Sequence, residues 1–252
     1  MAMKHKAGRA RLDLLLVERG LAETSQKAQA MILAGEVCVD GNRVDKAGMP
    51  VNEDARIEVT SRAQKFVGRG GVKLEGALED FAIDPCGRVC LDIGASNGGF
   101  TDCLLQHGAM RVYAIDVNME QLDWKLRQDS RVIRIERNAR DLRSEDIPEA
   151  AAVVVIDVSF ISVSKVITHA SSVAAPGAHF LILIKPQFEL PREEIPPGGI
   201  VTDEKLHEKA IGIVWKAVET AGLECLGVRP SRLRGAEGNQ EYFLHARKKS
   251  LE

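Results

Sequence analysis

Two charged residues of opposite sign each follow directly on an apolar run. Asp157 comes after Val-Val-Val-Ile at residues 153–156, and Lys185 comes after Leu-Ile-Leu-Ile at residues 181–184. If both runs are parallel strands, their carboxyl ends line the ligand crevice, so the two side chains face the same space. A buried lysine beside a carboxylate is costly, so the pair predicts acid–base chemistry. The alternative is a single ion pair that closes the sheet.

A glycine-rich loop follows an earlier apolar run and opens a helical pattern, which is the context of a nucleotide-cofactor loop. It reads Leu-Asp-Ile-Gly-Ala-Ser-Asn-Gly-Gly-Phe at residues 91–100. A dinucleotide fingerprint needs a glycine where Ser96 stands, and Asp92 would repel a pyrophosphate. Asp92 can instead accept hydrogen bonds from a cationic amino-acid moiety. The loop therefore favours S-adenosylmethionine, with Asp92, Gly94, Ser96, Gly98, Gly99 and Phe100 as its expected binding residues.

The next two strand ends carry polar residues that suit the rest of this cofactor. Asp116 follows the loop by about 20 residues, where an acidic side chain can bind ribose hydroxyls, although NAD enzymes share this feature. Asn138 or Asp141, after the third strand, suits the adenine amino group. The alternative is that these residues are helix caps and turn polars.

The elements that must position these residues form an alternating pattern from residue 88 onward, which is typical of a parallel sheet with crossover helices. Two final apolar runs close it with a hairpin. We therefore expect an α/β fold, the Rossmann-like seven-stranded sheet of methyltransferases. The expected strands lie at 89–93, 112–116, 132–135, 152–157, 180–185, 224–228 and 241–246, and the expected helices at 100–106, 119–127, 162–173 and 205–220.

A small α+β unit precedes this sheet. A helix from Leu12 closed by Gly20 is followed by a second helix, which Thr24 or Ser25 can cap and Gly35 ends. The dipeptide Asp-Gly at 40–41 then predicts a tight hairpin, and a further strand is expected at 56–59. The three glycines within 61–72 indicate a linker. The expected domains are therefore 9–60, the linker 61–72, and 73–248.

The small unit resembles the RNA-binding domain shared by ribosomal protein S4, bacterial tyrosyl-tRNA synthetases and several RNA-modifying enzymes. In that family the second helix usually starts with Ser-Arg, whereas here the sequence is Ser-Gln-Lys at 25–27. The resemblance implies RNA binding through Arg11 and Lys27.

Five motifs of the chain resemble the TlyA/hemolysin A family of ribosomal RNA 2'-O-methyltransferases, which is similar to FtsJ-type enzymes. They are Gly-Gly-Val-Lys-Leu at 70–74, the cofactor loop, Asp-Val-Ser-Phe at 157–160, Lys-Pro-Gln-Phe-Glu at 185–189 and Gly-Asn-Gln-Glu-Tyr-Phe at 238–243. FtsJ-type enzymes use a Lys-Asp-Lys-Glu tetrad. Matching motif by motif places it at Lys73, Asp157, Lys185 and Glu241. The resemblance implies cytidine in ribosomal RNA, free or within a subunit, as the substrate class.

A ribose 2'-hydroxyl is a poor nucleophile that must lose its proton as it attacks a sulfonium methyl group, so a base is required. Lys185 can be that base if burial and the second cation, Lys73, favour its neutral amine. Asp157 and Glu241 would orient the lysines and the hydroxyl. This chemistry needs no metal, and no pair of cysteines has the two-residue spacing of a zinc site.

Charge is spread unevenly along the chain. The net charge is -2, with 11 Lys and Arg against 9 Asp and Glu through Phe66 and 23 against 27 beyond it. RNA binding must therefore use local patches. Arg232 and Arg234, together with Arg229, precede Glu241 and could guide RNA to the crevice. The arginines at every third position from 131 to 143 are interpreted as solvated charge.

Other functions leave different signatures. Methylation of pyrimidine carbon five needs a cysteine nucleophile, and Pro85-Cys86 precedes the first strand of the sheet. Amino-group methylases carry a Pro-Pro-aromatic slot that Asp-Val-Ser-Phe at 157–160 lacks. An NAD oxidoreductase, a non-catalytic RNA-binding protein that keeps the fold, and a haemolytic protein stay as alternatives. The sequence shows neither the apolar span nor the amphipathic membrane helix that a haemolytic protein would need. With no signal-type segment in the sequence, we expect a cytoplasmic protein.

Overall fold

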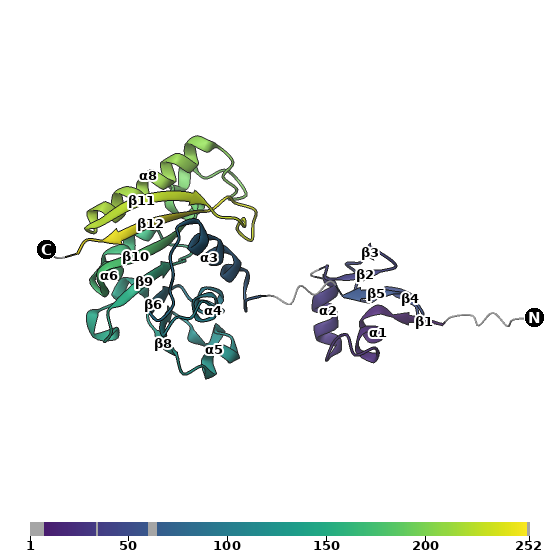
Figure 1. Ribbon diagram of the computed structural model, residues 1–252. Helices are drawn as coiled ribbons and strands as arrows, with labels where there is room; N and C mark the ends of the chain where they lie inside the picture. Colours follow the sequence, from purple (N-terminus) through teal and green to yellow (C-terminus); the bar gives the residue numbers. More distant parts are fainter. Residues whose placement is uncertain (1–7, 34, 60–64, 251–252) are drawn as a thin grey trace, which may run out of the picture. The chain divides into compact units, whose positions relative to one another are not determined.

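A computed structural model describes residues 8–33, 35–59 and 65–250. The chain divides into two compact units, one ending at residue 64 and the other beginning at residue 65. Figure 1 shows the helices and strands of each unit, and each unit has a hydrophobic core of its own.

The N-terminal unit packs two helices against short antiparallel strands. Its helices are α1 (Leu12–Glu18) and α2 (Ser25–Leu33), and its strands are β1 (Arg9–Arg11), β2 (Val37–Val39), β3 (Asn42–Arg43), β4 (Pro50–Asn52) and β5 (Ile57–Val59). β1 pairs with β4, and β2 lies between β3 and β5. The two helices, the hairpin and the strand at 57–59 match the sequence expectation. β1 and β4 were not expected, because they pair only with each other and carry no alternating apolar pattern.

Local turn chemistry sets the ends of these elements. Gly20 has a φ of 68° just after α1, and the Thr24 hydroxyl accepts a hydrogen bond from the Lys27 N–H at 3.2 Å, so Thr24 caps α2. In the hairpin, Asp40 and Gly41 have φ angles of 50° and 80°, as a two-residue type I' turn requires. Val39 therefore pairs with Asn42.

The second unit contains a seven-stranded sheet in the order β11-β12-β10-β9-β6-β7-β8. Only β12 runs antiparallel to its neighbours, β10 and β11. The central strands are continuous apolar runs because both faces of a parallel sheet are covered. The bounds are β6 (Val89–Ile93), β7 (Arg111–Asp116), β8 (Val132–Glu136), β9 (Ala151–Ile156), β10 (Ala174–Ile184), β11 (Leu223–Pro230) and β12 (Tyr242–Lys248).

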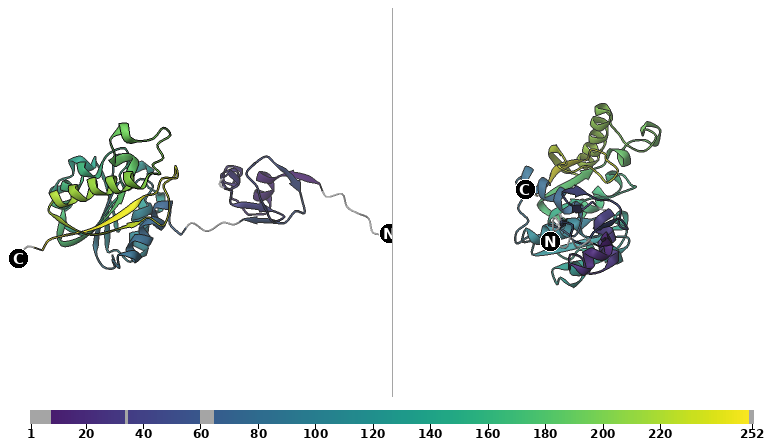
Figure 2. Two further views of the ribbon diagram at one scale, coloured as in Figure 1. Left: turned by 90° about the horizontal axis from the view of Figure 1, so that it is seen from above. Right: turned by 90° about the vertical axis from the view of Figure 1, so that its right-hand side faces the viewer.

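Helices cover both faces of this sheet (Figure 2). One face packs on α3 (Arg69–Asp80), α4 (Gly99–Gln106) and α5 (Trp124–Gln128). The other packs on α6 (Ile167–Ser172) and α8 (Glu204–Thr220), and α7 (Pro186–Glu189) follows β10 directly. Short 3-10 turns span Met119–Gln121, Ala139–Asp141, Ser144–Asp146, Val163–Lys165 and Arg192–Glu194. Within the described residues, no helix combines the length and the apolar character that crossing a bilayer requires.

In the second unit, one expected linker and two expected helices differ from the structure. α3 begins at Arg69, inside the stretch 61–72 expected to be a linker, of which residues 61–64 lie outside the described residues. Gly70 and Gly71 weaken helix propensity, but Gly70 lets α3 approach α4, since a Cβ on it would lie 3.2 Å from the Phe100 ring, and Gly71 leaves room for the Phe66 side chain. On the facing helix, a Cβ on Gly99 would lie 3.0 Å from the Gly71 nitrogen. The helix expected at 119–127 is broken at Leu122, where the backbone is extended and Asp123 caps α5. The helix expected at 162–173 is likewise split at Val166.

Candidate active site

The register of the sheet brings three residues that are distant in sequence to the same end of the strands. Ile156 of β9 pairs with Ile182 of β10, and Ile184 of β10 pairs with Tyr242 of β12. Asp157 follows β9, Lys185 follows β10, and Glu241 precedes the antiparallel β12. All three therefore emerge at the carboxyl end of the parallel strands, where ligands of such sheets bind.

Lys185 forms an ion pair with Asp157. Its Nζ lies 2.5 Å from Asp157 Oδ1 and donates a hydrogen bond to Ser159 Oγ at 2.8 Å. No donor among the described residues is aligned with Asp157 Oδ1, so the contact with Lys185 is electrostatic rather than a directed hydrogen bond. The Lys185 side chain is only 11% exposed, so the neighbouring carboxylate compensates for burying its charge.

Lys73 and Glu241 form the second pair. The Lys73 Nζ donates a hydrogen bond to Glu241 Oε2 at 2.5 Å, and the two side chains are 11% and 3% exposed. α3 carries Lys73, and the glycine contacts described above hold the start of this helix against α4. Each buried lysine at this end of the sheet thus has a carboxylate partner from another element.

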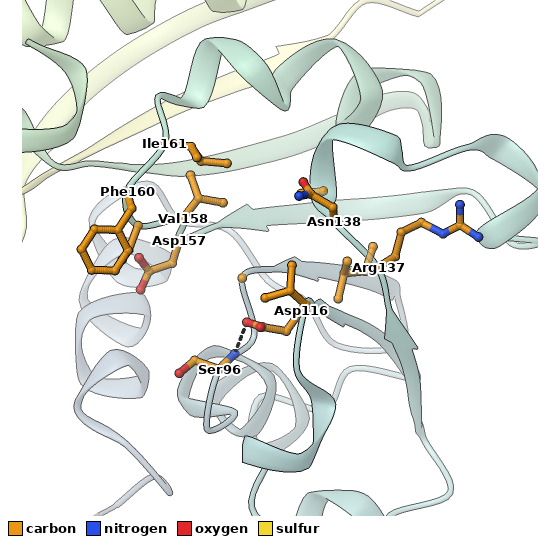
Figure 3. A pocket seen from close by; sticks show the side chains of 13 residues that line it. Ser96, Asp116, Arg137, Asn138, Asp157, Val158, Phe160 and Ile161 are labelled. Atoms are coloured by element: carbon orange, nitrogen blue, oxygen red, sulfur yellow. Dashed lines mark hydrogen bonds between the residues drawn. The ribbon is translucent and has the colours of Figure 1, made fainter. Parts of the chain in front are cut away.

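A cavity of about 370 Å³ opens beside Asp157, the partner of Lys185 (Figure 3). Gly94, with a φ of 88°, lets the cofactor loop pass so close to β9 that a Cβ there would overlap the Asp157 carbonyl oxygen. The Ser96 N–H donates to Asp116 Oδ2 at 2.9 Å, which joins the loop to the end of β7. The lining residues are Gly94, Ser96, Ile115, Asp116, Val117, Arg137, Asn138, Ala139, Asp157, Val158, Ser159, Phe160 and Ile161.

Comparison with protein families agrees with this arrangement. The profile of the family described as FtsJ-like methyltransferase matches residues 66–248, and that of the S4 domain matches residues 10–57. The chain belongs to the FtsJ-like methyltransferase family. The resemblance to the TlyA/hemolysin A group expected from the motifs is also confirmed.

Two relatives match this chain over both the S4 domain and the FtsJ-like domain. The 16S/23S rRNA (cytidine-2'-O)-methyltransferase TlyA of Mycobacterium tuberculosis is 44% identical over 243 residues, covering 96% of this chain and 91% of that protein. Hemolysin A of Brachyspira hyodysenteriae is 42% identical over 237 residues, covering 93% and 98%.

Solved structures show the same fold. One from Streptococcus thermophilus, provisionally described as a hemolysin, matches with a TM-score of 0.75 at 38% identity, covering 96% of this chain and 89% of that one. An S-adenosylmethionine-dependent methyltransferase from Mesorhizobium loti matches with a TM-score of 0.54 at 16% identity, covering 72% of this chain and 100% of that one. The expected seven-stranded methyltransferase sheet is thus confirmed.

Four of the residues expected to bind the cofactor line the cavity of the FtsJ-like domain: Gly94, Ser96, Asp116 and Asn138. Asn138 also caps a 3-10 turn, because its Oδ1 accepts from the Arg140 N–H at 3.1 Å. Its Nδ2 has no partner among the described residues, so this amide can still donate to a ligand.

Five others lie outside the cavity lining: Asp92, Gly98, Gly99, Phe100 and Asp141. Gly98, with a φ of 97°, turns the loop into α4 against Leu126. Gly99 packs on α3, and Phe100 is buried with its ring 6.1 Å from that of Phe243. Asp141 is exposed. The second half of the loop therefore packs helices together in this structure.

Asp92 lies in the interior of the FtsJ-like domain and not in the cavity. It is fully buried, and its Oδ2 accepts a hydrogen bond from the Thr101 hydroxyl at 2.7 Å, while Oδ1 has no donor among the described residues. Burial raises the pKa of Asp92 to about 7, with the Thr101 hydrogen bond acting in the opposite direction. Its alternation with Leu91 and Ile93 directs it toward α4, which a strand period of two could have predicted.

Sequence reasoning missed several lining residues that follow Asp157. Phe160 is 87% exposed, has a φ of 66°, and lies 5.1 Å from the ring of Phe188. Phe160 and Arg137 lie on opposite sides of the cavity (Figure 3). The motif Asp-Val-Ser-Phe was the available signal for Ser159 and Phe160. Arg137 had been interpreted as solvated charge, but it lines the cavity and pairs with Asp146 at 3.0 Å.

The four residues expected to bind RNA are all exposed, and three of them have acidic partners. Arg11 pairs with the buried Asp13 at 2.7 Å, and Lys27 pairs with Glu23 at 3.1 Å. Arg232 contacts both Glu79 and Asp80 at the end of α3. Arg234 instead donates to the Gly238 carbonyl at 3.1 Å, so its charge is not neutralised by a carboxylate in the described residues.

Proposed function

We propose that this protein transfers a methyl group from S-adenosylmethionine to the 2'-hydroxyl of a ribose in ribosomal RNA, with cytidine as the target nucleoside. The observation that carries the proposal is the pair of buried Lys–carboxylate contacts at the edge of the sheet beside the cofactor loop. The name of the Mycobacterium tuberculosis TlyA, with which this chain shares 44% identity, supports the substrate class.

The cavity fits an adenosyl ligand. Gly94 packs the cofactor loop against the end of β9 at the cavity wall, Asp116 offers carboxylate oxygens for ribose hydroxyls, and Asn138 offers an amide N–H for the base. When bound, S-adenosylmethionine supplies an electrophilic methyl group on sulfur. Asp92, one of the residues expected from the sequence to bind it, would act on the ligand only through the loop it supports, because its carboxylate is buried behind Thr101.

In the proposed mechanism, Lys185 is the base and the other three charged residues stabilise the charges that develop. Lys185 is an ammonium while it pairs with Asp157, so it must first release a proton to solvent. The neutral amine then accepts the proton of the 2'-hydroxyl as the oxygen attacks, and Asp157, 2.5 Å away, stabilises the ammonium that forms. Lys73, held by Glu241, places a positive charge near the oxygen on which negative charge develops. Holding the reacting atoms in line supplies much of the rate, up to roughly 7 to 11 kcal/mol in favourable intramolecular cases.

RNA would reach this site through two surfaces. The S4 domain, whose family includes a ribosomal protein, would bind ribosomal RNA or a subunit with Arg11 and Lys27. Near the active site, Arg234 is better suited to a phosphate than Arg232, because two carboxylates already neutralise Arg232. With ribosomal RNA as substrate, the proposal places the protein in the cytoplasm.

Transfer of tritiated methyl groups tests the proposal. Full-length protein is incubated with labelled S-adenosylmethionine and, separately, free ribosomal RNA, each subunit and whole ribosomes, and the modified nucleotide is mapped. We expect labelled 2'-O-methylcytidine, and loss of transfer in Lys185→Ala with cofactor affinity retained in calorimetry. Absence of label from every RNA, label on a base, or full turnover by Lys185→Ala would contradict the proposal.

A further inference from the structure

Ser159 makes a contact with the active site that the tetrad does not explain. Its Oγ accepts the hydrogen bond from Lys185 Nζ at 2.8 Å, and the same residue lines the cavity. It is the one hydrogen-bond acceptor of that Nζ within the part of the chain that the structure describes. Asp157 attracts the same ammonium but is not aligned as a hydrogen-bond acceptor.

This difference matters because a lysine amine turns easily about its terminal bonds. An attraction between charges sets a distance, whereas a hydrogen bond also sets a direction. With one N–H directed at Ser159, the remaining tetrahedral positions of Nζ have defined directions. A neutral amine in this orientation can present its lone pair to a hydroxyl in the cavity, instead of rotating among several orientations.

The loop that carries Ser159 is anchored on both sides of the exposed Phe160. On one side Lys185 bonds Ser159, and on the other Glu189 accepts hydrogen bonds from the Ser162 hydroxyl at 2.5 Å and the Val163 N–H at 3.0 Å. Lys185 and Glu189 lie at the two ends of the single turn α7. The left-handed backbone of Phe160, a strained conformation for an aromatic residue, is thereby held in place.

We propose that Ser159 is a positioning residue for methyl transfer, which fixes the direction of the Lys185 Nζ through its hydroxyl group. The inference rests on the proposed function and adds a fifth residue to the site. Ser159 acts through Lys185 and does not itself take the proton of the substrate. Its effect is therefore on turnover and not on binding of the cofactor or the RNA.

The test measures kcat and both KM values for full-length Ser159→Ala, Ser159→Thr and the control Ser164→Ala. Ser164 lies in the 3-10 turn that follows the same loop, and within the described residues its hydroxyl contacts only that of Ser162. We expect kcat of Ser159→Ala to fall roughly 10- to 100-fold, as misplacement of a catalytic group does, with both KM values within about two-fold of wild type. Ser159→Thr keeps the hydroxyl and should recover most of kcat, and Ser164→Ala should match wild type.

Three outcomes would overturn the inference while leaving the proposed function intact, provided that wild type is active and Lys185→Ala is not. They are a wild-type kcat in Ser159→Ala, an equal loss in Ser159→Thr, and a loss that appears as a raised KM for S-adenosylmethionine, which would make Ser159 a cofactor contact. If wild type transfers no methyl group to any ribosomal RNA, the proposed function fails and the inference fails with it.

Discussion

At the carboxyl end of the seven-stranded sheet, ion pairs join distant parts of the chain, whereas in the N-terminal unit they join near neighbours. Lys73 and Glu241 are 168 residues apart and buried, while Lys27 and Glu23 are four apart, with side chains 58% and 81% exposed. Breaking a buried pair costs about 3 to 5 kcal/mol, against about 0.2 to 1 kcal/mol for an exposed surface pair. The buried pairs at the end of the sheet therefore fix the positions of their side chains, whereas the exposed pairs of the N-terminal unit can separate at little cost when a ligand binds.

The strongest test of this contrast breaks the long-range pair. We expect Lys73→Met and Glu241→Gln each to lower kcat/KM by about three orders of magnitude, and the double variant to be no worse than the poorer single variant, because paired residues act as a unit. Methyl transfer and thermal unfolding are measured together, since each single change leaves a partner buried. Additive losses in the double variant would show that the two residues act independently.

Asp92 provides the next test, because it is a buried carboxylate without a cation. The folded protein keeps its proton up to a pKa of about 7, whereas the unfolded chain loses it near 3.8. Its stabilising contribution is therefore complete below 3.8, declines as the pH rises, and is lost above about pH 7. Relative to Asp92→Asn, we expect the free energy of unfolding of wild type to fall by about 2 to 3 kcal/mol between about pH 5 and pH 8.

Urea unfolding of the catalytic domain across that pH range measures this difference. Asp84→Asn, at an exposed position, is the matched control and should run parallel to wild type. A constant difference between wild type and Asp92→Asn would mean that Asp92 titrates alike in the folded and unfolded chains.

An intermediate case is Arg232, which joins distant segments but is half exposed. Because Glu79 and Asp80 already neutralise Arg232, this residue should contribute little to the counterion release that accompanies RNA binding. We expect Arg234→Ala to reduce the slope of log K against log salt by about one, and Arg232→Ala to change it much less. Fluorescence anisotropy with a ribosomal RNA fragment at several salt concentrations distinguishes them. Equal changes in slope would show that Arg232 leaves its carboxylates to bind RNA.

The smallest effect is expected at the local pair of the S4 domain. Glu23→Ala should strengthen RNA binding a few-fold by freeing Lys27, and Lys27→Ala should weaken it by a similar factor. Neither change should shift the thermal midpoint of the protein measurably. The same anisotropy titration, at a fixed low salt concentration, reports both variants. Weaker RNA binding by Glu23→Ala would mean that this carboxylate orients Lys27 productively.

The central strands of the catalytic domain could be predicted from sequence because strands buried on both faces appear as continuous apolar runs. α3 could not, because Gly70 and Gly71 oppose helix formation locally and are explained by tertiary contacts, with Phe100 of α4 beside Gly70 and Phe66 beside Gly71. β1 could not, since its pairing with β4 joins residues some 40 positions apart without an alternating pattern.

The candidate site was predictable where a residue type is tied to a strand end, as for Asp157, Lys185 and Asp116. It was less predictable within the cofactor loop, where neighbouring residues face different ways. Glycines that turn the chain toward a ligand and glycines that let two helices touch look alike in sequence, so Gly94 and Gly99 received the same interpretation. Contacts between hydroxyl groups and lysines, such as Ser159 with Lys185, carry no sequence period at all.

The antiparallel position of β12 between β10 and β11 also limits which insertions and deletions this strand can accommodate. Because side chains alternate between faces, inserting or deleting one residue after Glu241 would turn every following side chain of β12 to the opposite face of the sheet, including the buried Phe243 and Leu244. Changes of length in the hairpin before Asn239 should be tolerated far more readily. Diversity among functional variants is therefore expected as loop insertions upstream of this strand, and not within it.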